Sequence, residues 1–260
     1  MSIGCSGWAY DFWVGPFYPP RTRPRDYLKL YATVFDIVEV DSSFYRIPSR
    51  SMVSGWRRAT PEHFRFTAKF PRTITHEHKL RDVERPLGWF YSSFDELGPR
   101  LEAYVVQLPP SLKYERDFRS LEDFLSLLKE DVTHAVEFRH KSWFRKDVYA
   151  LLERYGVALA WSENQYLRTP PKLTADILYL RMIGDRSLER LGELQKDRSE
   201  EMRSWMDEVK GLEEEVRRGY IFFNNHYAGF GPGSVNEFRR LSGLMAREFP
   251  QSGQKTLAEF

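Results

Sequence analysis

The stretch HAVEFRHKSWFRKDVYALLERYGVALAWSE, residues 134–163, contains the repeating unit on which the fold prediction rests. Two short runs rich in β-forming residues, 134–140 and 157–163, flank a segment whose apolar residues recur at helical spacing: Val148, Leu151, Leu152 and Tyr155. This periodicity predicts an amphipathic helix. Strands joined by such a helix pair in parallel, because a parallel return needs a connection of this length. The stretch therefore predicts one strand–helix–strand unit.

Runs of the same kind recur along the whole chain. Besides the two above they cover residues 3–8, 36–44, 63–70, 104–110, 177–184 and 220–227, which makes eight predicted strands. Helical periodicity is also present in residues 121–128 and 202–216. Eight strands that alternate with helices in a chain of 260 residues predict an α/β fold, a (β/α)8 TIM barrel that forms a single domain over residues 1–260.

Two connections depart from this regular alternation. Residues 73–102, after the third strand, form a long and poorly periodic stretch, so we expect the barrel to be decorated there. Residues 164–176 contain Pro170 and Pro171 and are too short for a full helix, which predicts an irregular connection between the sixth and seventh strands. The last helix is expected to begin at Ser234, because Glu237 three residues later completes a capping box.

The composition narrows the class of protein. The 39 Lys and Arg residues nearly balance the 37 Asp and Glu residues, which disfavours nonspecific binding to duplex nucleic acid through a general positive field. Cys5 is the single cysteine, so the chain forms no internal disulfide, and this favours a cytoplasmic location. No stretch approaches the roughly 20 apolar residues that cross a bilayer, and we expect no membrane partner. Scarce Asn and Gln beside abundant Lys, Arg and Glu are typical of thermophiles.

Polar side chains fall at the ends of the predicted strands. In a barrel of parallel strands, catalytic groups come from the C-terminal strand ends and the loops that follow them. Side chains two positions apart on a strand share a face, so Glu137 and Arg139 are expected to point the same way. The polar groups at these ends are Glu39, Asp41, Ser42, Lys69, Gln107, Glu137, Arg139, His140, Glu163, Arg181, Asn224, Asn225 and His226.

Two interpretations of this charged cluster are open. In the first, Glu39 and Glu137 neutralise the neighbouring Lys and Arg side chains in a salt-bridge layer that plugs the barrel mouth. In the second, the charges line a cleft for a ligand, and the sequence favours this because they gather at one end of many strands. Carboxylates beside arginine stay ionised, which suits a general base. Glu137 is the first candidate base, with Glu39 as its partner.

Glycines after the last two strands suggest an anion site. Barrels often bind phosphate through the loops after strands seven and eight and a helix N-terminus. Gly184 follows the seventh strand, and Gly231 and Gly233 lie in AGFGPGS, residues 228–234, before the last helix. Glycine lets backbone amides approach an anion closely. With Lys69 and Arg181 expected nearby, a phosphate or carboxylate ligand is favoured over the alternative, a plain tight loop.

Aromatic and histidine residues offer weaker signals. Trp8, Tyr45 and Trp143 follow predicted strands and would stack on a base or a sugar, although packing of loops onto the rim is the commoner explanation. His76 and His78, with His140 and His226 at other strand ends, are candidate ligands for a divalent metal. Their spacing is not specific, and His76 equally suits orienting a substrate, so a metal is not favoured and no cofactor is assigned.

Seven segments resemble the YecE-like family, domain of unknown function seventy-two: GCSGWAYDFWVGPFYP, VEVDSSFYRIP, FTAKFPRTITH, VVQLPPSL, AVEFRHKSWF, YLRMIGD and YIFFNNHYAG. The resemblance implies a TIM barrel related in shape to metal-dependent sugar isomerases and endonuclease IV-like enzymes, with no settled activity. It emphasises Gly7, Trp8, Glu39, Ser42, Phe44, Tyr45, Lys69, Thr75, His76, Gln107, Glu137, Arg139, Trp143, Arg181, Gly184 and Asn225. Two residues depart from the family pattern. Ile183 stands where histidine is usual, which argues against any site that needs this histidine, and Asp41 stands where asparagine is common.

These observations predict an enzyme that acts on a small anionic ligand, phosphorylated or nucleotide-like, at the C-terminal barrel face. The expected chemistry is hydrolysis or proton transfer, as in a hydrolase or an isomerase. Two alternatives are a noncatalytic module that binds nucleic acid or a protein, and an endonuclease IV-like metal-dependent nuclease. In the enzyme, Glu137 and Glu39 serve as base, cations stabilise negative charge, and His76 and Asn225 orient the ligand. The ligand-binding residues are Lys69, Arg139, Arg181, Asn225, Gln107, Ser42, Tyr45, Trp8 and Trp143, with Gly184, Gly231 and Gly233 for the anion.

Overall fold

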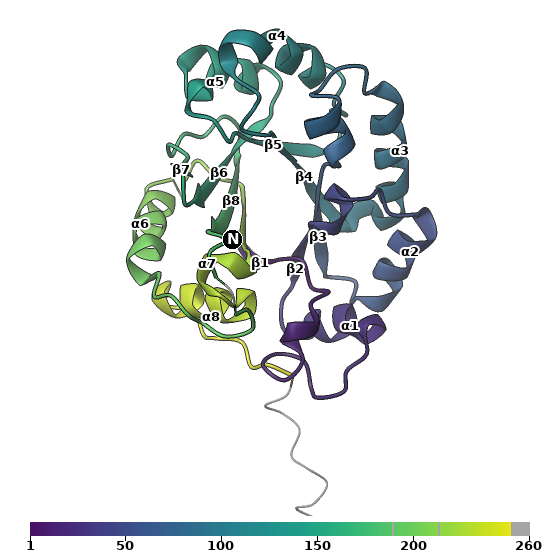
Figure 1. Ribbon diagram of the computed structural model, residues 1–260, viewed down its shortest axis with the longest axis vertical. Coiled ribbons are helices and arrows are strands. Elements are labelled where there is room, and N and C mark those ends of the chain that lie inside the picture. Colours follow the sequence, from purple (N-terminus) through teal and green to yellow (C-terminus); the bar gives the residue numbers. More distant parts are fainter. Residues whose placement is uncertain (189, 213, 251–260) are drawn as a thin grey trace, which may run out of the picture.

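The computed structural model describes residues 1–188, 190–212 and 214–250. A ring of strands lies at its centre and helices surround the ring (Figure 1). The strands are β1 (Ser2–Ser6), β2 (Ile37–Val40), β3 (Arg65–Lys69), β4 (Leu101–Gln107), β5 (Thr133–Glu137), β6 (Ala158–Asn164), β7 (Leu167–Arg168), β8 (Ile177–Gly184) and β9 (Arg218–Phe223).

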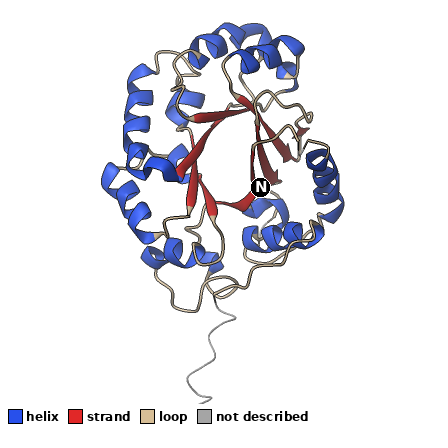
Figure 2. Ribbon diagram, turned by 180° about the vertical axis from the view of Figure 1, so that it is seen from behind, coloured by secondary structure: helices blue, strands red, loops and turns tan. Residues whose placement is uncertain are grey.

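Eight of these strands close into a barrel. They pair in parallel in the order β5, β4, β3, β2, β1, β9, β8 and β6, and a further pairing between β5 and β6 completes the ring. β7 lies outside the ring and pairs antiparallel with β6. Each of the eight predicted runs overlaps one barrel strand, and the view from behind shows the closed ring with helices outside it (Figure 2). The (β/α)8 prediction is confirmed.

The helices alternate with the strands and form the outer layer. The α-helices are α1 (Tyr27–Tyr31), α2 (Arg50–Ala59), α3 (Glu84–Phe94), α4 (Tyr114–Leu125), α5 (Lys146–Arg154), α6 (Ser199–Lys210), α7 (Asn225–Ala228) and α8 (Gly231–Leu241). Shorter segments are the 3-10 turns η1 (Asp11–Trp13), η2 (Pro24–Asp26), η3 (Ser42–Phe44), η5 (Asp95–Arg100) and η6 (Lys141–Trp143), and the π-helical turn η4 (Thr73–Glu77). Within the described ranges, no helix is long and apolar enough to cross a membrane.

Both predicted irregularities are present. The connection after β3 contains η4, α3 and η5, so the barrel is decorated there. The connection from β6 to β8, residues 165–176, contains β7 and no helix. Hydroxyl groups in this connection accept hydrogen bonds from the backbone of β6, because Thr174 Oγ1 accepts from Leu159 N at 2.7 Å and Thr169 Oγ1 from Ser162 N at 3.1 Å.

The predicted start of the last helix is wrong. α8 begins at Gly231, with Phe230 as its N-cap, and Ser234 lies inside the first turn. The Ser234 hydroxyl donates back to Phe230 O at 3.0 Å, so it caps nothing. The helix starts earlier because Pro232 fixes a helical φ in the first turn and needs no amide partner there.

Strand alternation divides the core in two. The outer layer, between strands and helices, is large and rich in aromatic residues. The barrel interior is a separate apolar cluster of alanine, larger aliphatic and aromatic residues: Ile37, Ala103, Val105, Ala135, Ala158, Ala160, Ile177, Tyr179, Tyr220 and Phe222. Because side chains two positions apart share a face, Glu39 follows Ile37 inward, and Glu137 and Arg181 likewise continue the inward rows of their strands. The apolar interior is thus covered by charged side chains at its C-terminal end.

Gly184 ends β8 where the backbone of α7 presses against it. It has a φ of +71°, and a Cβ built there would lie 2.2 Å from the backbone oxygen of His226. Only glycine combines this left-handed backbone with so close an approach.

We expect Gly184→Ala to lower the free energy of unfolding more than Gly156→Ala. Gly156 also has a positive φ, +62°, but a Cβ there would meet nothing within 4 Å. The control substitution should cost about 1–2 kcal/mol from backbone strain alone. Gly184→Ala should cost about 1–3 kcal/mol more, because α7 must move. Urea denaturation measures both losses, and equal losses would contradict the packing argument.

Candidate functional site

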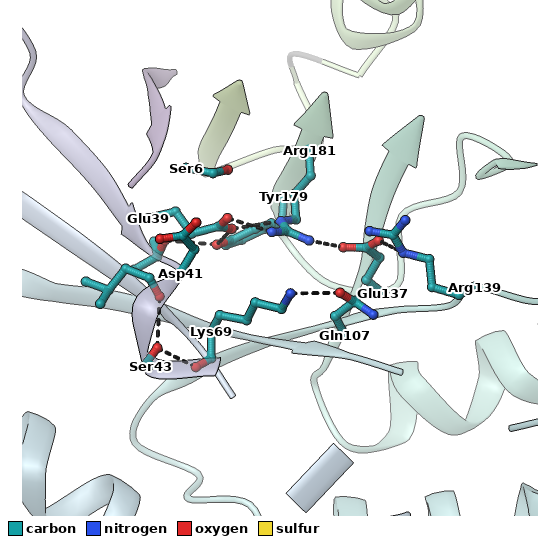
Figure 3. A network of polar contacts seen from close by, with 12 residues as sticks. Ser6, Glu39, Asp41, Ser43, Lys69, Gln107, Glu137, Arg139, Tyr179 and Arg181 are labelled. Atoms are coloured by element: carbon teal, nitrogen blue, oxygen red, sulfur yellow. Dashed lines mark hydrogen bonds and ion pairs between the residues drawn. The ribbon is translucent and has the colours of Figure 1, made fainter. Parts of the chain in front are cut away.

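Arg181 of β8 lies at the centre of the barrel mouth and bridges two glutamates (Figure 3). Its Nε and Nη2 donate to Oε2 and Oε1 of Glu39 on β2, at 2.8 and 2.7 Å. Its Nη1 donates to Oε2 of Glu137 on β5. The glutamates are 0% exposed and Arg181 is 2% exposed. The salt-bridge layer that was the first of the two interpretations is therefore present.

These three charges are stable in the interior because each is paired. Burial lowers the pKa of Arg181, but Glu39 and Glu137 outweigh this effect and hold that pKa above its ordinary value. Burial raises the pKa of Glu137, but Arg139 and Arg181 outweigh it and lower the pKa to about 2. Glu137 and Arg181 are consequently both charged at neutral pH.

Tyr179 supports this layer from inside the barrel. Its hydroxyl donates to Glu39 Oε2 at 2.7 Å and lies 2.9 Å from Thr67 Oγ1. Glu39 thus accepts three hydrogen bonds from side chains. No sequence pattern singled out Tyr179, although its position two residues before Arg181 places it on the same inward row.

Arg139 is the outer partner of Glu137. Its Nε forms an ion pair with Glu137 Oε1, as the shared face of the two residues predicted, and its side chain is 17% exposed. Neither Nε nor Oε1 has a partner with hydrogen-bond geometry. Glu137 therefore divides its charge between two guanidinium groups, and Arg139 keeps unused hydrogen-bonding capacity at the mouth.

The amine of Lys69, at the end of β3, makes its direct contacts with neutral groups. Its Nζ donates to Gln107 Oε1 at 2.8 Å and lies 4.0 Å from the centroid of the Phe44 ring. Among the described residues, no carboxylate oxygen lies within 4.0 Å of this nitrogen, since none of their ion pairs includes Lys69. Burial, and after it the charge of Arg181, lowers the pKa of Lys69 to about 7. Lys69 is thus a cation that loses its proton easily.

Two further polar residues of the mouth were not predicted as site residues. Ser6 ends β1, its side chain is drawn beside this network in Figure 3, and its buried Oγ has no hydrogen-bond partner. Asp41 follows β2, and its Oδ2 accepts from the Tyr10 hydroxyl at 3.1 Å. Burial, together with the charge of Glu39, raises the pKa of Asp41. The charges of Lys69 and Arg181 act in the opposite direction and lower the pKa of Asp41.

The rim is formed by η3 and η4. His76 packs edge-on against Phe44, with ring centroids 4.9 Å apart, and its Nδ1 lies 2.8 Å from Thr75 Oγ1. Burial, and next the charge of Lys69, lowers the pKa of His76 to about 4, so the ring is neutral at neutral pH. Ser42, the first residue of η3, and Tyr45, which follows η3, are exposed. These predicted residues lie on the side of the mouth next to Lys69.

The two predicted tryptophans are used in packing. Trp8 packs edge-on against Trp56, with centroids 5.3 Å apart. Trp143 stacks on Phe138, and its Nε1 donates to Leu112 O at 2.9 Å. Both belong to the outer core layer, in agreement with the alternative that these aromatic residues serve packing.

Asn225 and the glycines form a tight junction beside the barrel. Asn225 Oδ1 accepts from Trp13 Nε1 at 2.9 Å and from the Gly231 amide at 3.0 Å. A Cβ at Gly231 would lie 3.4 Å from the sulfur of Cys5, which belongs to the outer layer, and one at Gly233 would lie 2.7 Å from the Phe230 ring. The Gly231 amide is therefore already satisfied, and anion binding by Gly184, Gly231 and Gly233 stays a prediction.

The histidines are not gathered at one place. His140 Nδ1 lies 2.9 Å from Ser142 Oγ, and His76 contacts Thr75. Within residues 1–188, 190–212 and 214–250, no group of three or more His, Cys, Asp or Glu side chains is arranged to hold a metal ion. We therefore assign no residues to a metal.

Comparisons with known proteins place this chain among proteins of unassigned activity. The family model "Protein of unknown function DUF72" matches residues 2–257. The UPF0759 protein YecE of Escherichia coli K12 is 33% identical over 144 residues, which are 55% of this chain and 50% of that protein, so the match spans about half of its length. The UPF0759 protein YunF of Bacillus subtilis is 23% identical over 282 residues, covering 95% of this chain and 98% of that protein.

A solved structure extends the likeness to three dimensions. The crystal structure of a DUF72 family protein from Thermotoga maritima matches with a TM-score of 0.79 and 30% identity, covering 93% of this chain and 98% of that one. The fold and the sequence family therefore agree over nearly the whole chain.

We expect Glu137→Gln to lower the free energy of unfolding by about 3–5 kcal/mol, because it leaves buried guanidinium charge without its partner. The matched control is Glu102→Gln. Glu102, in β4, also bridges two arginines, Arg65 at 3.0 Å and Arg218 at 2.9 Å, but those side chains are 36% and 55% exposed. The control should cost about 1 kcal/mol. Chemical denaturation compares the two, and a loss at Glu102 as large as that at Glu137 would refute the argument from burial.

The lowered pKa of Lys69 predicts a pH-dependent stability difference from Lys69→Met. In the unfolded chain this amine has a pKa of about 10.4, whereas in the folded protein the pKa is about 7. Between these values the unfolded state binds more protons, so the wild type gains stability relative to the variant as pH rises, by at most about 1.4 kcal/mol per pH unit. Urea titrations at several pH values measure the difference. A difference that is constant over this range would exclude the shift.

Proposed function

The chain belongs to the DUF72 family of TIM-barrel proteins, and from the chemistry of its barrel mouth we propose that it is an enzyme acting on a small anionic ligand, such as a phosphorylated or nucleotide-like compound. The observation that carries the proposal is the charge of the mouth. Three cations, Lys69, Arg139 and Arg181, face two wholly buried carboxylates, and Lys69 has neutral partners.

An anion would complete the pairing of this layer. Glu39 and Glu137 together bring two negative charges, and Glu137 is shared by two arginines. Asp41 lies at the same mouth, where burial and the charge of Glu39 raise its pKa and Lys69 and Arg181 oppose this effect. Hydrogen bonds from ionised donors to an anion are stronger than those between neutral groups. Lys69 and Arg139 are the residues that would contact the ligand.

The roles within the enzyme differ from those expected for the two glutamates. Both oxygens of Glu137 face arginines and its pKa is about 2, which makes it a weak base. We assign Glu39 and Glu137 to holding the arginines in place. Lys69, with a pKa of about 7, suits proton transfer at neutral pH. The neutral ring of His76 would orient the ligand beside it. Proton transfer is therefore favoured over hydrolysis.

The two other candidate functions lack a supporting observation at this mouth. Binding of single-stranded nucleic acid relies on aromatic rings on which bases stack. Trp8 and Trp143 are buried in the core, and of the aromatic residues predicted for this role Tyr45 is exposed, at 71%. A metal-dependent nuclease needs converging ligands, and the described residues form no such group. We do not extend the proposal to these functions.

Sulfate binding tests the proposed anion site, because the charge of sulfate is constant over the pH range used. We expect sulfate to bind about tenfold or more tightly at about pH 6 than at about pH 8.5, since Lys69 carries its proton below a pKa of about 7 and loses it above. Isothermal titration calorimetry at low ionic strength measures the affinity at each pH.

Two variants separate this effect from other titrating groups. Lys69→Met should weaken binding at the lower pH and flatten the pH dependence. Lys141→Met removes an exposed lysine after β5 and should leave both unchanged. Sulfate binding that is absent, or that keeps its full pH dependence without Lys69, would count against the proposed site.

A further inference from the structure

The amine of Lys69 contacts a neutral amide and an aromatic ring. Its hydrogen-bond acceptor is the neutral amide oxygen of Gln107, at 2.8 Å. A neutral amine still donates this bond, so deprotonation leaves the contact intact. Nζ lies over the face of the Phe44 ring, 4.0 Å from its centroid, so the ring covers this side of the amine and also attracts its charged form. A lysine that is desolvated beside an apolar group and near other cations is activated as a nucleophile.

Charged groups from several elements face this amine. Arg181 and Arg139 disfavour its charged form, and Glu137 and Glu39 favour it, with burial the largest effect on its pKa. Asp41 and His76 also lie within electrostatic reach. The arginines are held by the glutamates, so the positive field around Lys69 is fixed by the fold.

We propose that Lys69 Nζ is the nucleophile that forms an imine with the carbonyl group of an anionic oxo compound, such as an α-keto acid or a ketose phosphate. This inference rests on the proposed function and names its substrate class. Lys69 supplies the bond-forming atom, and Arg139, whose side chain is 17% exposed, is the cation that would hold the anionic group.

The step balances without an added reagent. The lone pair of the neutral amine attacks the carbonyl carbon, and the π electrons of the C=O bond move to oxygen. A proton passes from nitrogen to that oxygen through water, which gives a carbinolamine. A second proton transfer to the hydroxyl releases one water molecule as the C=N bond forms. Carbonyl compound and amine thus give imine and water.

Borohydride trapping tests the proposal on the full chain. The protein is incubated at about pH 7 with pyruvate or with dihydroxyacetone phosphate, reduced with sodium borohydride, and mapped by peptide mass spectrometry. We expect the reduced adduct at Lys69 to exceed that at the exposed Lys141 by about tenfold or more, because far more of the Lys69 amine is neutral at this pH. Lactate and glycerol 3-phosphate, which lack a carbonyl group, should give no adduct. Acetone, which lacks the anionic group, should give little.

The variant Lys69→Arg removes the nucleophilic amine but keeps a positive charge at this position. Arginine keeps a cation at this position, so sulfate binding should persist at about pH 6, while the adduct disappears. If sulfate binds the wild type but Lys69 is labelled no more than Lys141, the imine is refuted and the anion site stands. If sulfate does not bind and Lys69 forms no selective adduct, both proposals fall. Should the variant not fold, the peptide map of the wild type still decides.

Discussion

The arrangement of the barrel mouth depends on one buried guanidinium. Arg181 is almost wholly enclosed, and an unpaired charge there would cost several kcal/mol. Its partners come from β2 and β5, while it projects from β8, so the ion pairs reach across the barrel and not between neighbouring strands. The interior below these ion pairs is apolar, so the charged groups gather at its C-terminal end. Closure of the barrel and pairing of these charges therefore support each other.

The same ion pairs determine which polar side chains of the mouth keep capacity to contact a ligand. Glu39 accepts three hydrogen bonds from side chains, and both oxygens of Glu137 face arginines. Arg139 and Lys69 keep hydrogen-bonding capacity for a ligand. Arg139 Nε forms an ion pair with Glu137 that lacks hydrogen-bond geometry, and Lys69 donates to a neutral amide. The sequence analysis predicted a carboxylate as the reactive group, whereas we propose the amine of Lys69.

Strand periodicity explains why the fold and the inward direction of the charges were predictable. Alternation along each strand puts Glu39, Glu137 and Arg181 inside once the strands are recognised. Periodicity does not say which cation each carboxylate contacts, because that depends on the stagger of strands far apart in the chain. It does not separate packing from binding either, since an aromatic ring such as that of Trp143 fills a core as readily as it stacks on a ligand. Ser6 has no distinguishing pattern, and its importance comes from its missing partner in the folded protein.

The two demands on Lys69 constrain any ligand of this mouth. An anionic group close to Nζ would favour the ammonium form, whereas imine formation needs the neutral amine. Both demands are met when Arg139 neutralises the anionic group while the carbonyl carbon approaches Nζ. Arg139 suits this role because arginine stays charged and its Nε makes no hydrogen bond among the described residues. In that arrangement the opposite charges of the anion and Arg139 have largely cancelling effects on the pKa of Lys69. Arg181 continues to favour the neutral form of the amine. A ligand that meets both demands would carry the anionic group and the carbonyl at different positions.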